Sequence, residues 1–278
     1  MNIIFFGSTA DSILVLSRLK GIVCVVTQPP RPIGRKQIVT PTPVEEWAKL
    51  QKIPVLSFPH NNEKPWLFEN EQTVVDTLAP FKADLLISAS FGQKIPMKSI
   101  RSAKFGGLNV HPSLLPKWRG ADPVPWAILS GDHQTGVTIV TLEEAFDEGK
   151  IIAQQKYPIT DTDTSDPLRT KLFELGAELL INNLSDYSSG KNTGKPQKTT
   201  ESPYARRMTR DDGFIPWEEF QPELLDRKLR ALNPWPGIWT KINNKRLKLI
   251  ALQPNVIVQL EGKKPVAFEQ FKKAYLPS

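Results

Sequence analysis

The stretch NIIFFGSTADSILVLSRLKGIVCVV (residues 2–26) predicts a fold in which strands and helices alternate. Two short apolar runs, typical of buried strands, stand on either side of a segment with apolar residues at helical spacing. That segment carries its apolar residues at Ile13, Leu14, Leu16 and Leu19. A strand, a helix and a second strand in this order favour an α/β domain with a parallel sheet.

The same alternation continues to about residue 187. Further strands are predicted at residues 54–56, 84–90, 106–110, 135–144 and 150–159, and helices at 40–51 and about 166–186. This order favours a Rossmann-like, open, mostly parallel sheet covered by helices. The first strand is followed by GSTADS and not by GxGxxG, which argues against a nicotinamide cofactor, and Ser8 and Thr9 are interpreted as helix caps.

The sequence changes character after residue 187. Residues 188–206 are rich in Ser, Gly, Lys, Thr and Pro and have no apolar period, so they are predicted to be a linker. Residues 207–278 contain a short amphipathic helix and then several strand patterns, which predicts a small β-rich second domain.

The net charge of +7 is concentrated in the last third of the chain. Residues 191–278 hold 17 Lys and Arg against nine Asp and Glu, whereas residues 1–190 are close to neutral. A basic module of this kind suggests an anionic partner, and nucleic acid is the commonest. A merely solvated basic surface explains the charge equally well.

Composition also predicts the compartment. The lone Cys24 sits in an apolar run and cannot form an internal disulfide, and no stretch has the pattern of a signal peptide or the length of a membrane span. A cytoplasmic protein without membrane contact is therefore expected. No metal site is expected, because His60 and His133 have no ligand spacing with His111.

The stretch GLNVHPSLLPKWRG (residues 107–120) carries the candidate chemistry. If it begins as a strand, Asn109 and His111 project on one face at the carboxyl edge of the sheet, where α/β active sites lie. An amide donor beside an imidazole can stabilise an oxyanion and transfer one proton, which acyl transfer requires. A pair that merely caps a turn is the alternative.

A third polar group is available in EEAFDEGKII (residues 143–152), where Asp147 precedes a glycine turn. A carboxylate there could orient the imidazole and accept charge as an attacking amine loses its proton. Glu143, Glu144 and Glu148 are nearby competitors, interpreted as solvated surface charges.

Together, NVHPSLLPKWRGADPVPWAI and TGVTIVTLEEAFDEGKII resemble the core signature of the folate-dependent formyltransferases. The resemblance implies that Asn109, His111 and Asp147 form the catalytic triad, and that 10-formyltetrahydrofolate is the formyl donor, with no metal. It also implies a folate pocket lined by Phe91, Gly92, Ile95, Ser113, Leu114, Leu115 and Pro116.

Within that family, residues 25–48 and 232–242 resemble members that formylate methionyl initiator tRNA. The resemblance implies that Arg31, Arg35 and Lys36 contact tRNA from a basic loop, with Arg35 at the position of the family's key arginine. It further implies a C-terminal OB-like β-barrel, abridged here because the chain after residue 251 is short, in a protein expected to be a monomer.

Three functions follow from these observations. The first is formyl transfer to the α-amine of methionyl initiator tRNA. The second keeps the donor but uses a nucleotide-linked amino sugar or another small amine as acceptor. The third is a nucleic-acid-binding protein without catalytic activity.

Overall fold

The computed structural model describes residues 1–34, 36–198 and 202–276. It divides into two compact units, each discontinuous in sequence. Unit 1 comprises residues 1–121, 135–157 and 169–204, and unit 2 comprises residues 122–134, 158–168 and 205–278. The predicted domain boundaries at residues 187 and 207 stay predictions. The two compact units are defined by contacts, and each combines several separate stretches of the sequence.

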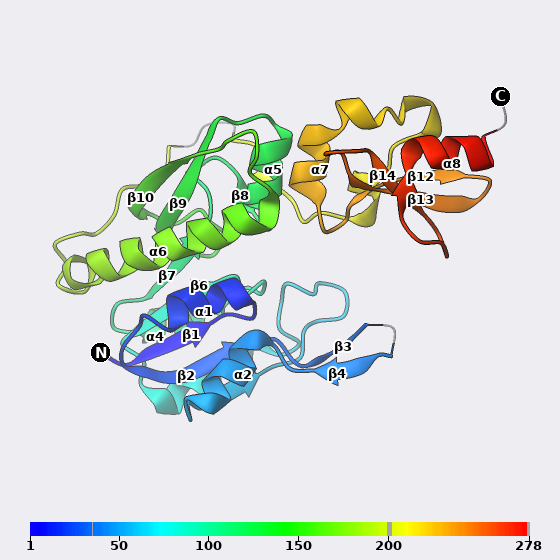
Figure 1. Ribbon diagram of the computed structural model, residues 1–278. Coiled ribbons are helices and arrows are strands. Elements are labelled where there is room, and N and C mark those ends of the chain that lie inside the picture. The colour runs from blue at the N-terminus through cyan, green and yellow to red at the C-terminus, as the bar shows by residue number, and fades with distance from the viewer. Residues whose placement is uncertain (35, 199–201, 277–278) are drawn as a thin grey trace. The chain divides into compact units, whose positions relative to one another are not determined.

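A seven-stranded sheet forms the centre of unit 1, in the order β10-β9-β7-β6-β1-β2-β5 (Figure 1). Its strands are β1 (Ile3–Phe6), β2 (Ile22–Thr27), β5 (Val55–Ser57), β6 (Leu85–Ala89), β7 (Gly107–His111), β9 (Gln134–Thr141) and β10 (Ile151–Pro158). The pairs β1–β2, β1–β6, β2–β5 and β6–β7 are parallel, and β7–β9 is antiparallel. The predicted mostly parallel α/β sheet is confirmed.

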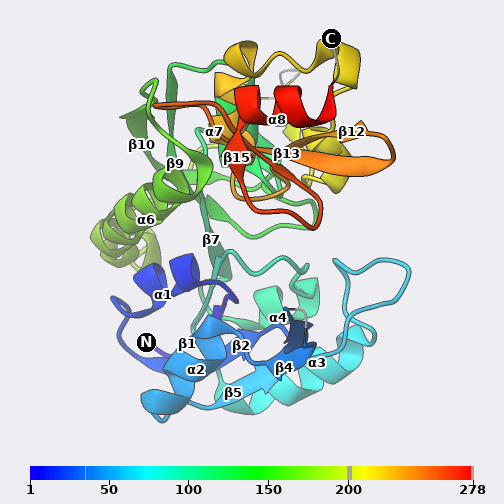
Figure 2. The ribbon, with the colours of Figure 1, turned by 45° about the vertical axis from the view of Figure 1, so that its right-hand side comes forward.

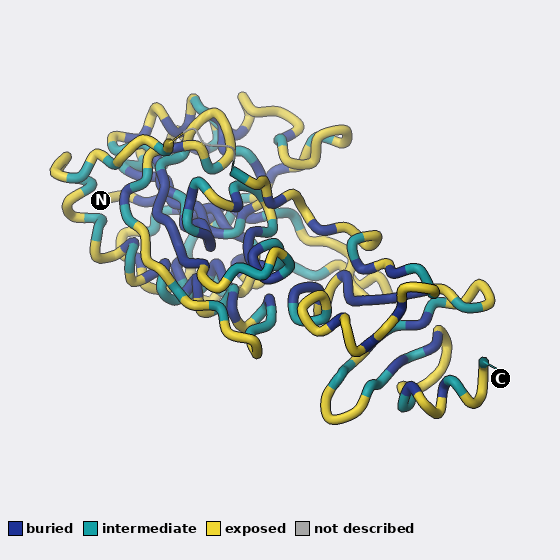
Figure 3. The backbone as a smooth tube through the Cα atoms, turned by 90° about the horizontal axis from the view of Figure 1, so that it is seen from above, coloured by how far each residue is buried: buried dark blue, intermediate teal, exposed yellow. Residues whose placement is uncertain are grey.

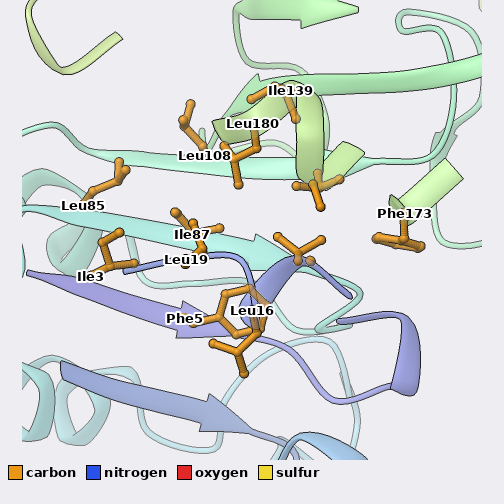
Figure 4. Close-up of a cluster of buried hydrophobic side chains, with 14 of the residues drawn as sticks. Ile3, Phe5, Leu16, Leu19, Leu85, Ile87, Leu108, Ile139, Phe173 and Leu180 are labelled. Atoms are coloured by element: carbon orange, nitrogen blue, oxygen red, sulfur yellow. The ribbon is translucent and has the colours of Figure 1, made fainter. Parts of the chain in front are cut away.

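Helices pack on both faces of this sheet, because the strands direct apolar side chains to both faces. The helices are α1 (Ala10–Leu16), α2 (Pro43–Leu50), α3 (Glu71–Leu78), α4 (Met97–Ser102) and α6 (Ser165–Ser188), with a 3₁₀ turn η1 (Ala79–Phe81). Residues of α1, α2 and α6 pack against one face, whereas α3 and α4 pack against the other. Figure 4 shows Leu16 of α1 and Phe173 and Leu180 of α6 in this first cluster. Figure 3 shows buried residues gathered in the interior of this unit.

Local sequence sets the ends of the first helices. Thr9 caps α1 with a reciprocal capping box to Ser12, as predicted, whereas the Ser8 hydroxyl accepts from the Gln28 N–H at 3.1 Å and is not the cap. Thr42 caps α2, and Pro43 occupies its first turn. Two further pairs of short strands occur: β3 (Arg31–Ile33) with β4 (Ile38–Thr40), and β8 (Arg119–Gly120) with β11 (Tyr204–Ala205).

Unit 2 contains an open antiparallel sheet in the order β12-β13-β14-β15. Its elements are α5 (Pro123–Leu129), η2 (Arg210–Gly213), η3 (Trp217–Glu219), η4 (Pro222–Leu224), α7 (Asp226–Leu232), β12 (Ile238–Ile242), β13 (Lys245–Ala251), β14 (Ile257–Leu260), β15 (Val266–Ala267) and α8 (Phe268–Tyr275). Phe268 and Phe271 of α8 join the core of this sheet, and Figure 2 shows α8 beside β15. The small antiparallel domain is confirmed, but among the described residues its sheet is open and not a closed barrel.

Candidate functional site

The carboxyl end of β7 brings two predicted residues together. Asn109 and His111 are two residues apart in a regular strand, so both side chains project from the same face, while Leu108 and Val110 face the core. β7 lies between β6 and β9, with Asn109 paired to Ser88 and to Val140. The strand therefore fixes the position of both side chains.

Asp147 completes the predicted group from a distant loop between β9 and β10. Its Oδ1 accepts a hydrogen bond from Nδ2 of Asn109 at 3.2 Å and lies 3.4 Å from Nδ1 of His111. Its Oδ2 accepts a bond from the backbone N–H of Gly120 at 2.9 Å. The side chains of His111 and Asp147 are only 5% and 9% exposed. The three residues thus form one shielded polar group.

The tautomer of His111 follows from its second contact. Nε2 lies 2.9 Å from the carbonyl oxygen of Trp118, which can only accept, so Nε2 carries a proton. Nδ1 is then the ring nitrogen directed toward Asp147 and toward any reacting group beside it. This places an imidazole nitrogen, an amide donor and a carboxylate at one point, which is a suitable set for acyl transfer.

Asp147 also adopts an unusual backbone conformation, with a φ of +58°. Left-handed backbone at a residue other than glycine costs about 1–3 kcal/mol and is concentrated at functional sites. The neighbouring acids differ from it: Glu144 is paired with Lys94 and Glu148 with Arg119, and both are more than half exposed. The interpretation of these two as surface charges agrees with their exposure.

The segment after His111 is held by β9 and β10. The Thr138 hydroxyl donates to the Ser113 carbonyl oxygen at 2.6 Å and accepts from the Leu115 N–H at 3.1 Å and from Gln154 Nε2 at 2.9 Å. Ser113 Oγ donates to the carbonyl oxygen of Lys117 at 2.7 Å. The Ser113 hydroxyl therefore stabilises the local backbone. The segment from Ser113 to Pro116 follows directly after β7, the strand that carries Asn109 and His111.

The remaining predicted folate residues follow β6, the neighbour of β7. Phe91 and Ile95 are buried, and the Phe91 ring meets that of Phe6 edge-on at 5.4 Å. Gly92 has a φ of +84° and is exposed. The Phe91 carbonyl oxygen accepts a bond from Gln28 at 3.2 Å.

Two of the predicted tRNA contacts, Arg31 and Lys36, lie on the β3–β4 hairpin of unit 1, which extends away from the sheet (Figure 1). Arg31 and Lys36 are exposed, and Arg31 is hydrogen-bonded to Gln28. Arg35 lies outside the described residues. Arg31 and Lys36 thus lie on the β3–β4 hairpin, whereas Asn109 and His111 lie on β7 and Asp147 lies in the loop between β9 and β10.

Sequence reasoning missed several groups that complete the site. The Gly120 N–H and the Trp118 carbonyl are backbone groups, and the only signal for them was that both residues lie within the quoted stretch 107–120. Near the site, partial burial and the negative charge of Asp147 raise the pKa of the Tyr204 phenol, although Tyr204 is 61% exposed. The described residues contain no group of three or more His, Cys, Asp or Glu that could hold a metal, and no helix there is long and apolar enough to cross a membrane.

Comparisons with known proteins identify the family of the chain. The family model "Formyl transferase" matches residues 1–184, and "Formyl transferase, C-terminal domain" matches residues 207–257. A methionyl-tRNA formyltransferase of Listeria monocytogenes serotype 4a is 40% identical over 251 residues, which is 89% of this chain and 78% of that protein.

Solved structures share the fold at much lower identity. A 4-N formyltransferase from Francisella tularensis is 18% identical, with a TM-score of 0.66, covering 90% of this chain and 97% of its own. HypX from Aquifex aeolicus, solved in complex with tetrahydrofolic acid, is 18% identical with a TM-score of 0.61, and all of this chain matches 48% of that one. These two likenesses concern the fold alone.

Proposed function

The chain belongs to the formyl transferase family, and from that membership we propose that it transfers the formyl group of 10-formyltetrahydrofolate to the α-amine of methionyl initiator tRNA. The observation that carries the proposal is the convergence of Asn109 and His111 on one oxygen of Asp147. The 40% identity to a methionyl-tRNA formyltransferase over 89% of the chain supports the acceptor.

The site residues divide the reaction between them. The amine nitrogen forms a bond to the formyl carbon, and the bond from that carbon to the donor nitrogen then breaks. One proton leaves the amine and one reaches the departing nitrogen. We assign stabilisation of the oxyanion to Asn109 Nδ2 and to the Nδ1–H of His111 in its doubly protonated form. We assign to Asp147 the orientation of this imidazolium and the acceptance of charge as the amine loses its proton.

Binding of the two substrates is assigned to separate surfaces. The folate is proposed to lie along Phe91, Gly92 and Ile95 and the segment from Ser113 to Pro116. Arg31 and Lys36, together with Arg35, supply cations for tRNA phosphates, which position the substrate without reading its sequence. The basic residues after 190 add salt-dependent affinity. A monomer in the cytoplasm remains the expectation.

The decisive experiment measures formyl transfer from 10-formyltetrahydrofolate with four acceptors: methionyl initiator tRNA, elongator methionyl-tRNA, a nucleotide-linked amino sugar and a free amine. We expect rapid transfer to the initiator alone, and its loss in His111→Ala. Transfer to the sugar but not to tRNA would replace the proposal with the small-amine function. Binding of tRNA with no transfer to any acceptor would indicate a binding protein.

A further inference from the structure

Gln197 lies in the segment predicted to be a linker, yet its side chain is hydrogen-bonded to the loop that carries Asp147. Its Nε2 donates to the carbonyl oxygens of Asp147 at 2.6 Å and of Gly149 at 2.9 Å. Its Oε1 accepts from Nε and Nη2 of Arg119, at 3.0 and 2.8 Å. One half-buried side chain therefore joins residues that are 50 and 78 positions away in the sequence.

The orientation of this amide follows from its partners. Carbonyl oxygens only accept hydrogen bonds and a guanidinium only donates them, so Nε2 must face the loop and Oε1 must face Arg119. Both amide hydrogens and the amide oxygen are then used. A carboxylate in the same place would keep the Arg119 contact but could not donate to the two carbonyl oxygens.

The loop needs such support because its own conformation is unfavourable. Asp147 has a φ of +58°, and its neighbours Phe146 and Glu148 are 41% and 53% exposed, so packing on them is limited. The Asp147 carboxylate is bound on one side by Asn109 and Gly120. Gln197 binds the backbone of the same residue, and Arg119 extends the network to Glu148 at 3.0 Å.

We propose that Gln197 is a positioning residue for the transfer reaction, which clamps the backbone of residues 147–149 so that the Asp147 carboxylate meets Asn109 and His111. The inference rests on the proposed function. It places a residue that positions a catalytic group in the connecting segment.

The test compares Gln197→Ala, Gln197→Glu and the matched control Gln259→Ala by steady-state formyl transfer to methionyl initiator tRNA. Gln259 donates a single side-chain bond to the Lys263 carbonyl at 2.9 Å in unit 2, so its loss should leave kcat at the wild-type value. Both Gln197 variants should lower kcat by about 10- to 100-fold, because a catalytic group displaced by about 1 Å loses that much. KM for both substrates should change less than about twofold.

If Gln197→Ala does not fold, Gln197→Glu still tests the inference, because it keeps the Arg119 contact and the length of the side chain. Circular dichroism identifies the folded variants. Wild-type kcat in folded Gln197→Glu would overturn the inference.

A double-mutant cycle separates positioning from general stability. If Gln197 acts only through Asp147, then adding Gln197→Ala to Asp147→Ala should lower kcat no further. Losses that multiply would overturn the inference while the proposed function stands. Absence of formyl transfer by the wild-type protein would instead overturn the proposed function, and the inference with it.

Discussion

The triad at the end of β7 and the β3–β4 hairpin belong to the same compact unit but are built in opposite ways. The side chains of His111 and Asp147 are 5% and 9% exposed and have several fixed hydrogen bonds. On the hairpin, Ile33, Ile38 and Val39 are 58%, 61% and 64% exposed. Group transfer needs donors fixed before the reaction, whereas a recognition surface keeps side chains free for a partner.

The largest effect should come from removing an oxyanion donor. Asn109→Ala should lower kcat by about 10²- to 10³-fold with little change in KM, because the amide acts mainly in the transition state. Steady-state kinetics checks this. Asn183→Ala, which loses a bond from Nδ2 to the Leu179 carbonyl in α6, is the matched control and should keep the wild-type kcat. A near-normal rate in Asn109→Ala would contradict the assigned mechanism.

A smaller but still large effect should follow from crowding the Asp147 loop. A Cβ at Gly149 would lie 1.9 Å from the Thr141 carbonyl oxygen, so the backbone must shift. Gly149→Ala should lower kcat by about tenfold or more and the free energy of unfolding by about 1–3 kcal/mol. Kinetics and urea unfolding measure the two quantities. Unchanged kcat would mean that the loop can move without displacing the carboxylate.

The hairpin cations should affect binding and not turnover. Arg31→Ala with Lys36→Ala should raise KM for methionyl-tRNA by about tenfold and reduce the salt dependence of log Kd by about one unit per residue, with kcat unchanged. Binding at several salt concentrations tests this. Lys20→Ala with Lys156→Ala, which removes two exposed lysines outside the hairpin, is the control. A fall in kcat at saturating tRNA would mean that the hairpin contributes to turnover as well as to binding.

The same contrast determines what the sequence could predict. Asn109 and His111 were found because strand alternation is local, and Thr9 because a cap needs only its own helix. Asp147 was identified by the resemblance, since its place before a glycine turn does not by itself select it among the nearby acidic residues. The clamp of Gln197 was missed, since a contact across 50 residues leaves no period in the sequence, and the Gly120 N–H was missed because every residue except proline has one.

Unit 2 shows a different limit. The helix α8 was missed, since no element was assigned to residues 268–275, although Phe268, Phe271 and Tyr275 recur at helical spacing. The expected barrel is an open four-stranded sheet among the described residues. Strand patterns predict pairing between neighbours in sequence, but closure depends on how the first and last strands meet, which is not a local property.

The smallest effect should come from the apolar side chains of the hairpin. Ile33→Ser and Val39→Ser should leave the free energy of unfolding within about 0.5 kcal/mol of wild type, because neither side chain is buried. If tRNA covers them, each change should raise KM for methionyl-tRNA by about two- to fivefold through lost apolar burial. Val44→Ser, at a fully buried position in α2, should instead lower the free energy of unfolding by about 2 kcal/mol or more. An unchanged KM in both hairpin variants would leave recognition to the cations alone, and the apolar exposure of the hairpin would then need another partner to explain it.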